Sequence, residues 1–224
     1  MRYTIEGNSL PVVICDLEPG EAIISENGGR TWSRGDIVTE TKGGGLGKMF
    51  GRMLSGESLF LSHYTARSQA QIAFASSFPG SIVAKELGPG ESIICQKSAF
   101  MASTDKVTLS TAFQKKLGAG LFGGEGFIMQ KITGPGIVFL EIDGYASTID
   151  LRAGERLVAD TGVVAIYEES CTMSVETVKG VKNLLLGGEG VFDTIITGPG
   201  KVVVQSMPIS SFAARISSHI SVSN

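Results

Sequence analysis

The chain is short of the residues on which most catalytic sites depend. It contains two histidines, His63 and His219, among 224 residues. Two isolated histidines support neither a histidine-based metal site nor a Ser-His-Asp arrangement. The three cysteines, Cys15, Cys95 and Cys171, are far apart and form no Cys-x-x-Cys pair, so we expect buried, reduced thiols. We therefore predict no enzyme activity, no catalytic residues, no metal and no cofactor.

Charge is also scarce. Charged residues make up 18% of the chain and hydrophobic residues 42%, whereas about a quarter of a typical soluble domain is charged. This balance predicts apolar surface that a partner or a second copy covers. The net charge of −3 argues against a dedicated duplex DNA binder, although a local basic patch remains compatible with it. Nucleic acid is accordingly an unlikely partner.

Long apolar runs are missing as well. No stretch of 18 apolar residues occurs, so the sequence predicts no transmembrane helix. The first residues, 1–7, have no continuous apolar segment and include Glu6, which argues against a signal peptide. We expect a cytoplasmic protein.

What the chain does contain is self-similarity. A Gly-Glu pair recurs 68 and then 64 residues later, at Gly56-Glu57, Gly124-Glu125 and Gly188-Glu189. The string Ile-Thr-Gly-Pro-Gly occurs at 132–136 and again at 196–200, and a turn motif ending in Gly-Glu occurs at 17–21, 87–91 and 151–155. Internal repetition at this spacing determines the architecture of a whole chain. We predict one compact body of three tandem β repeats, approximately 1–78, 79–143 and 144–208, in a pseudo-threefold arrangement, with a tail at 209–224.

The local pattern is that of β structure. Short runs rich in Val, Ile and Phe alternate with Gly, Pro, Asn and Asp. These runs predict strands at 12–15, 22–25, 59–64, 70–75, 92–95, 106–110, 127–132, 137–142, 157–160, 163–167, 171–176, 191–196 and 201–206. A single helix is predicted over Pro208–Ile216, with Phe212, Ala213 and Ile216 on one face.

The tripled glutamates Glu21, Glu91 and Glu155 have two interpretations. If the repeats surround an axis, three carboxylates could converge and hold a hard cation. Alternatively, each glutamate accepts a hydrogen bond from a backbone N–H of its own turn. The second interpretation is the simpler one, because a repeated turn repeats such a role.

Basic residues precede each Gly-Glu pair and form the candidate binding site. On equivalent loops they could form a basic, partly apolar ring that binds an anionic polymer, lipid headgroups or another subunit. The alternative is three solvated loops whose lysine stems cover the core. The candidate residues are Lys48, Arg52, Lys115, Lys116, Lys179 and Lys182.

At the Gly-Gly-Glu-Gly and Thr-Gly-Pro-Gly strings, and over essentially all of 3–206, the chain resembles the family of altered inheritance of mitochondria protein 24. That resemblance implies a fold similar to the tryptophan RNA-binding attenuation protein, a double-stranded β-helix or jelly-roll-like sandwich, and a homotrimer. It implies no established catalytic residues, and mitochondrial members are implicated in inner-membrane organisation. The first repeat departs from the pattern, because Thr65-Ala66-Arg67-Ser68 replaces Thr-Gly-Pro-Gly.

The leading hypothesis for function is a non-enzymatic binding or scaffold protein that associates with itself, with a trimer favoured. One alternative is a small-molecule or metal-dependent enzyme of the double-stranded β-helix type. The other is binding of RNA or an anionic membrane through the basic loops.

Overall fold

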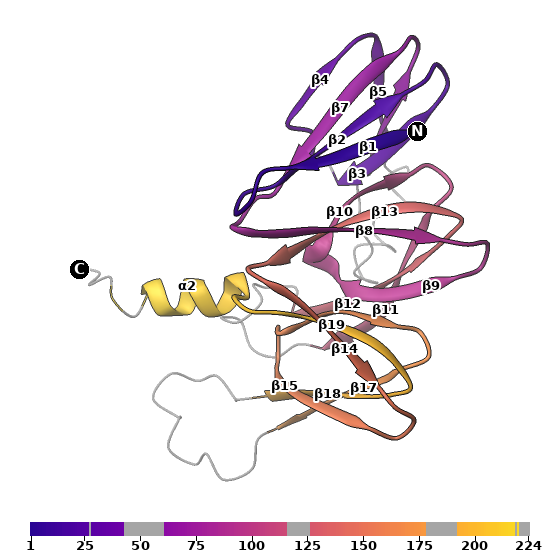
Figure 1. Ribbon diagram of the computed structural model, residues 1–224. Helices are drawn as coiled ribbons and strands as arrows, with labels where there is room; N and C mark the ends of the chain where they lie inside the picture. The colour runs from indigo at the N-terminus through magenta and orange to yellow at the C-terminus, as the bar shows by residue number, and fades with distance from the viewer. Residues whose placement is uncertain (27, 43–60, 116–125, 178–191, 218, 220–224) are drawn as a thin grey trace, which may run out of the picture.

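The fold is an all-β, sandwich-like arrangement with one short helix at its C-terminal end, as the sequence predicts. The computed structural model describes residues 1–26, 28–42, 61–115, 126–177, 192–217 and 219. In Figure 1 the chain descends from the N-terminal strands at the top to the strands of its last third at the bottom.

The strands fall into three groups along the chain. The first group is β1 (Arg2–Glu6), β2 (Val12–Leu17), β3 (Ala22–Glu26), β4 (Trp32–Arg34), β5 (Ile37–Lys42), β6 (Leu61–Ala66) and β7 (Ala70–Ala75). The second is β8 (Gly80–Leu87), β9 (Ser92–Gln96), β10 (Phe100–Thr104), β11 (Thr108–Lys115), β12 (Phe127–Thr133) and β13 (Gly136–Asp143), with the short 3₁₀ helix η1 (Lys97–Ala99) between β9 and β10. The third is β14 (Ala146–Leu151), β15 (Arg156–Asp160), β16 (Val164–Glu168), β17 (Thr172–Thr177), β18 (Phe192–Thr197) and β19 (Gly200–Gln205).

One antiparallel pairing scheme occurs in all three strand groups. In the first, β7 lies between β2 and β4, while β6 lies between β3 and β5. In the second, β13 lies between β8 and β10, while β12 lies between β9 and β11. The third group pairs β14, β19 and β16, and separately β15, β18 and β17. The repeat boundaries, the jelly-roll form and the pseudo-threefold arrangement stay predictions.

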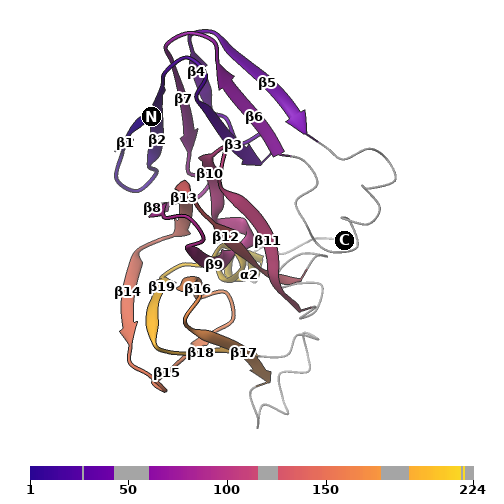
Figure 2. The same cartoon turned by 90° about the vertical axis from the view of Figure 1, so that its right-hand side faces the viewer.

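Pairing between groups produces four sheets. Strand β3 of the first group pairs with β10 of the second, and β9 of the second pairs with β16 of the third. The first sheet is β1-β2-β7-β4, the second β5-β6-β3-β10-β13-β8, the third β11-β12-β9-β16-β19-β14 and the fourth β15-β18-β17. Both ribbon views show these sheets following one another along the length of the molecule (Figures 1 and 2). The two middle sheets are therefore each built from two strand groups.

Three clusters of buried side chains lie between successive sheets. Leu17 and Phe74 of the first sheet pack in one cluster with Ile23 and Phe139 of the second. Next in the series are a cluster that joins the second and third sheets and a cluster that joins the third and fourth. In β13, Phe139 belongs to the first cluster and its neighbours Val138 and Leu140 to the second, because successive side chains of a strand point to opposite faces. The middle sheets are therefore buried on both faces.

A buried amide pair strengthens the junction between the second and third strand groups. The side-chain Nε2 of Gln96 donates to the carbonyl oxygens of Gly162 and Val164, at 2.8 and 2.7 Å. The Nε2 of Gln205 donates to the same Gly162 oxygen at 2.7 Å. Buried polar groups are tolerated where such partners satisfy them. The two groups are thus held together by side-chain hydrogen bonds as well as by strand pairing.

The predicted C-terminal helix is present as α2, which spans Ile209–Ser217 and so begins and ends one residue later than predicted. It has no buried residue, and it lies beside the body of sheets near the C-terminus (Figure 1). Its Phe212 ring contacts Phe78 edge-on, with 5.2 Å between ring centroids. Within the part of the chain that is described, no helix has both the length and the apolar character needed to cross a bilayer.

Candidate functional site

The turn glutamates hold their own turns together. The side-chain Oε2 of Glu21 accepts a hydrogen bond from the backbone N–H of Glu18 at 2.9 Å. Glu91 accepts from Gly88 N at 2.9 Å, and Glu155 accepts from Arg152 N at 2.8 Å. In each turn the glutamate N–H also donates back to the same residue's carbonyl oxygen, at 3.0 to 3.1 Å. The turn interpretation is confirmed, and the other three Gly-Glu glutamates lie outside the described residues.

The cation site considered for these carboxylates has no support in the geometry. The three turns belong to different strand groups, and each carboxylate already caps a backbone N–H. Among the residues with described positions, no three His, Cys, Asp or Glu side chains come together as a metal site would require.

One of the six basic candidates, Lys115, belongs to the described residues. Lys48, Arg52, Lys116, Lys179 and Lys182 lie outside the described residues. Their segments connect β5 to β6, β11 to β12 and β17 to β18, which are equivalent hairpins in the three strand groups. Whether they act together as a binding surface stays a prediction.

Lys115, at the end of β11, is the one candidate whose surroundings are described. Its Nζ donates to the carbonyl oxygen of Val175 at 3.0 Å and lies 5.8 Å from the ring centroid of Phe192. Both partners belong to the third strand group. Lys115 therefore bridges two groups, in keeping with the interpretation that lysine stems cover the core.

The three cysteines are free and buried, as expected from the sequence. Burial raises the pKa of the Cys15 thiol to about 12, and the neighbouring Asp16 adds to the rise. Burial alone raises the pKa of Cys95 to about 12, and burial together with Glu168 raises the pKa of Cys171. A thiol acts as a nucleophile only when ionised, so these cysteines are inert near neutral pH.

Thiol labelling tests whether the cysteines are buried and un-ionised in the folded protein. We expect a colorimetric thiol reagent at pH 8 to leave Cys15 and Cys95 unreacted in the native protein and to label all three thiols after unfolding. Their folded pKa of about 12 exceeds the ordinary value of 9.0, so the unfolded chain loses these protons first as pH rises. The protonated thiols of Cys15 and Cys95 therefore contribute fully to the free energy of unfolding below pH 9, and this contribution is lost between pH 9 and 12. Rapid labelling of the native protein at pH 8 would contradict the assignment.

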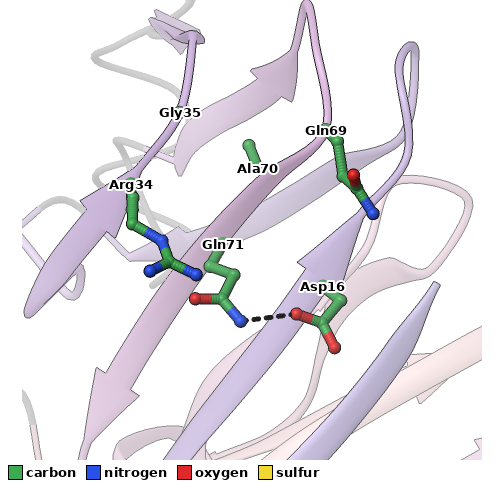
Figure 3. Close-up of a pocket in the computed structure, with 6 residues that line it drawn as sticks. All are labelled: Asp16, Arg34, Gly35, Gln69, Ala70 and Gln71. Carbon is green, nitrogen blue, oxygen red and sulfur yellow. Dashed lines mark hydrogen bonds between the residues drawn. The ribbon is translucent and has the colours of Figure 1, made fainter.

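A polar pocket of about 270 Å³ lies on the first sheet beside β4 (Figure 3). Asp16 of β2, Gln71 of β7 and Arg34 of β4 are successive cross-strand partners, so their side chains form one row across the sheet. Gln71 Nε2 donates to Asp16 Oδ1 at 2.7 Å, and the Arg34 guanidinium points toward Gln71 in Figure 3. The row offers one carboxylate, one cation and one amide. These groups can hold a small polar molecule.

The backbone at this pocket requires glycine. Gly35 follows β4 with a φ of +98°, which side-chain-bearing residues rarely adopt. A Cβ there would lie 2.8 Å from the Cβ of Ala70 and 2.8 Å from the carbonyl oxygen of Gln69. This pocket was not predicted from the sequence. Asp16, Gln71 and Arg34 come together only because β7 lies between β2 and β4. No local sequence motif predicts that strand order.

Large apolar side chains remain at the surface of the described residues. Two of them belong to strands at the two ends of the series of sheets, Trp32 of β4 and Val158 of β15. Three others, Ile209, Phe212 and Ile216, follow one face of α2. These surfaces, rather than the shallow pocket, are the clearest candidates for contact with a partner.

The chain is similar along its whole length to proteins of unassigned activity. A model of the family described as mitochondrial biogenesis AIM24 matches residues 3–207. An uncharacterised protein of Streptococcus pyogenes serotype M6 is 29% identical over 234 residues, which cover 100% of this chain and 93% of that protein. A crystal structure of a Streptococcus pyogenes protein has a TM-score of 0.79 and 26% identity, covering 98% of this chain and 99% of the other.

A partial match points elsewhere. The phosphomevalonate dehydratase large subunit of Methanothermobacter thermautotrophicus is 29% identical over 112 residues, 47% of this chain and 28% of that protein. The family model instead covers nearly the whole chain, including the repeated turn motifs and all three strand groups. The chain belongs to the mitochondrial biogenesis AIM24 family.

Proposed function

We propose that this protein is a non-enzymatic binding or scaffold protein that associates with itself, with a homotrimer as the favoured form. One observation carries the proposal: large apolar side chains stay exposed on a chain in which 18% of residues are charged. Exposed apolar groups gathered on particular elements are typical of surfaces that a partner covers. Members of homo-oligomers cover such groups with copies of themselves.

The remaining observations are compatible with this role. The turn glutamates, Lys115 and the three thiols have structural partners or are buried. The proposal includes a cytoplasmic location. The three free cysteines agree with it, because disulfides are rare in the cytoplasm. Neither the enzyme alternative nor RNA or membrane binding gains a specific observation from the described residues.

The mass of the protein in solution tests the proposal. We expect light scattering during size-exclusion chromatography, at several micromolar concentrations, to give a multiple of the 23.5 kDa chain mass. Three times that mass is the favoured result. A single chain at every concentration would overturn the proposal, because the exposed apolar groups would then remain uncovered.

A further inference from the structure

Each of the two outer sheets corresponds to one half of a middle sheet. The second sheet joins β5-β6-β3 of one strand group to β10-β13-β8 of the next, and the third joins β11-β12-β9 to β16-β19-β14. The fourth sheet consists of β15, β18 and β17, the counterparts of the first half alone. The first sheet contains β4, β7 and β2, the counterparts of the second half, with β1 added at its edge.

Each outer sheet therefore ends at a strand whose counterpart in the middle sheets pairs with a further strand. Strand β15 holds the place of β3 and β9, which pair with the next strand group. Strand β4 holds the place of β10 and β16, which accept that pairing. Among the described residues, β15 pairs with β18 alone and β4 with β7 alone. Such open edges are ready for another strand.

The same two strands carry exposed apolar side chains. Counted from the turn glutamate, Val158 occupies the position of Ile24 and Ile94, which are buried at the two internal junctions. Val158 is 55% exposed. Trp32, paired with Ala73, occupies the position of Ala102 and Ile166, which are also buried. Trp32 is 40% exposed. The counterparts Ile94, Ala102 and Ile166 lie in clusters between stacked sheets, whereas Val158 and Trp32 lie on the outer faces of the two end sheets.

The two edges of one chain lie at opposite ends of the molecule. In both ribbon views β4 is at the top and β15 at the bottom, with the two middle sheets between them (Figures 1 and 2). A chain cannot therefore join its own edges in this structure. A second copy can supply the complementary edge.

We infer that β15 of one chain pairs antiparallel with β4 of another, so that two outer sheets complete one sheet of the internal type. This inference rests on the proposed self-association and names its interface. The composite order is β17-β18-β15 followed by β4-β7-β2-β1 of the second copy.

The internal junctions also determine the register of this contact. Ala102 pairs with Ser25 and Ile166 with Cys95, which places Trp32 of the second copy opposite Ala159. Ser103 pairs with Ile24 and Tyr167 with Ile94, which places Ser33 opposite Val158. The position facing Trp32 is small in every case, since Ser25, Cys95 and Ala159 align. A large indole can therefore be accommodated there.

The contact joins two different surfaces, so an open assembly keeps one free β15 edge at one end and one free β4 edge at the other until it closes. Head-to-tail contacts form rings when the rotation between copies closes and filaments when it does not. The homotrimer predicted from the sequence is one closed form.

Substitutions at each edge test the inference on the purified full chain. Val158→Lys removes an exposed apolar side chain from β15 and places a charge in the predicted contact. Leu10→Lys is the matched control, since Leu10 is 61% exposed and belongs to neither edge. We expect light scattering to give the wild-type mass for L10K and a mass approaching one chain for V158K at the same concentration, with at least a tenfold weaker association. Far-UV circular dichroism should be unchanged in both.

Mixing two edge variants gives a sharper readout. Trp32→Lys leaves β15 intact, and Val158→Lys leaves β4 intact. Each alone should be reduced to single chains, whereas an equimolar mixture should form a two-chain species of twice 23.5 kDa and nothing larger. A head-to-tail contact that involves β15 of one chain and β4 of the other gives this result, because one compatible pair of surfaces remains in the mixture.

The possible outcomes distinguish self-association from the specific β15–β4 interface. A wild-type protein that is a single chain at every concentration overturns both the self-association and its interface. A wild-type oligomer that V158K leaves intact overturns the interface alone. If W32K fails to fold by circular dichroism, V158K against L10K still decides, because Val158 is exposed in the single chain.

Discussion

Replacing Gly134 by alanine should lower the free energy of unfolding by about 3 kcal/mol. Gly134 follows β12 in the first Ile-Thr-Gly-Pro-Gly string, and its N–H donates to the carbonyl oxygen of Glu91 at 3.0 Å. An added Cβ would lie 2.5 Å from the carbonyl oxygen of Gly88 and 2.7 Å from the Cβ of Leu87. The obstacle is mainly backbone, so the two turns would have to separate. Chemical denaturation of both proteins at one concentration measures the loss.

Gly90→Ala is the control for this experiment. Gly90 lies in the adjacent turn with a φ of +77°, and an added Cβ would meet nothing within 4 Å. Only the left-handed backbone conformation is penalised, at about 1 kcal/mol. Equal losses for G134A and G90A would show that the close approach of the two turns is not what requires glycine at 134.

The repeated motif thus has a physical explanation. Gly198 in the second string approaches Leu151 and Arg152 as closely as Gly134 approaches Leu87 and Gly88. The first strand group places Ala66 at the corresponding position, where its N–H donates to the carbonyl oxygen of Glu21. Three residues, 67–69, separate β6 from β7 there, so the connection follows a different path that has space for alanine. The departure noted in the sequence is accommodated by a longer turn.

Replacing Phe139 by alanine should cost about 4 kcal/mol of unfolding free energy. Phe139 is fully buried between the first and second sheets, and Tyr3 contacts its ring edge-on with 5.0 Å between centroids. Its strand neighbours Val138 and Leu140 are buried on the opposite face of the sheet. The strand cannot move into the cavity without disturbing the next cluster. Guanidinium denaturation monitored by circular dichroism measures the effect.

Tyr145→Ala provides the comparison for this core substitution. Tyr145 is 74% exposed, and its backbone N–H, which the substitution leaves in place, donates to Ser206 Oγ. We expect a change within about 0.5 kcal/mol. If F139A loses no more stability than Y145A, the assignment of Phe139 to the core is wrong.

Much of the strand content follows from local pattern. The run at 70–75 coincides with β7, and the predicted strands at 12–15, 92–95 and 127–132 begin at the first residues of β2, β9 and β12. Strands β1, β4, β5, β8, β10 and β14 were not predicted, and of these β1 and β4 are exposed along their length. The segment 2–6 of β1 does alternate polar and apolar residues, so this strand could have been predicted from its pattern.

One candidate site could be predicted from the local sequence, and another could not. The role of Glu91 is determined within five residues, since its carboxylate reaches only to Gly88, and the repeated sequence was sufficient to predict it. The row of Asp16, Gln71 and Arg34 arises from segments up to 55 residues apart. Its members carry no shared motif. Only the order of strands in the first sheet brings them together.

The sequence by itself determined the all-β class, the repeated turns, the burial of the cysteines, the C-terminal helix and the family. Each of these depends on contacts within a few residues or on composition, which the linear order of residues contains directly. Only the tertiary structure decided that β3 pairs with β10 and β9 with β16, and that β15 and β4 each have one edge without a partner strand among the described residues. Which strand edges meet depends on how whole sheets stack and bury their faces, and no local pattern along the chain specifies that choice.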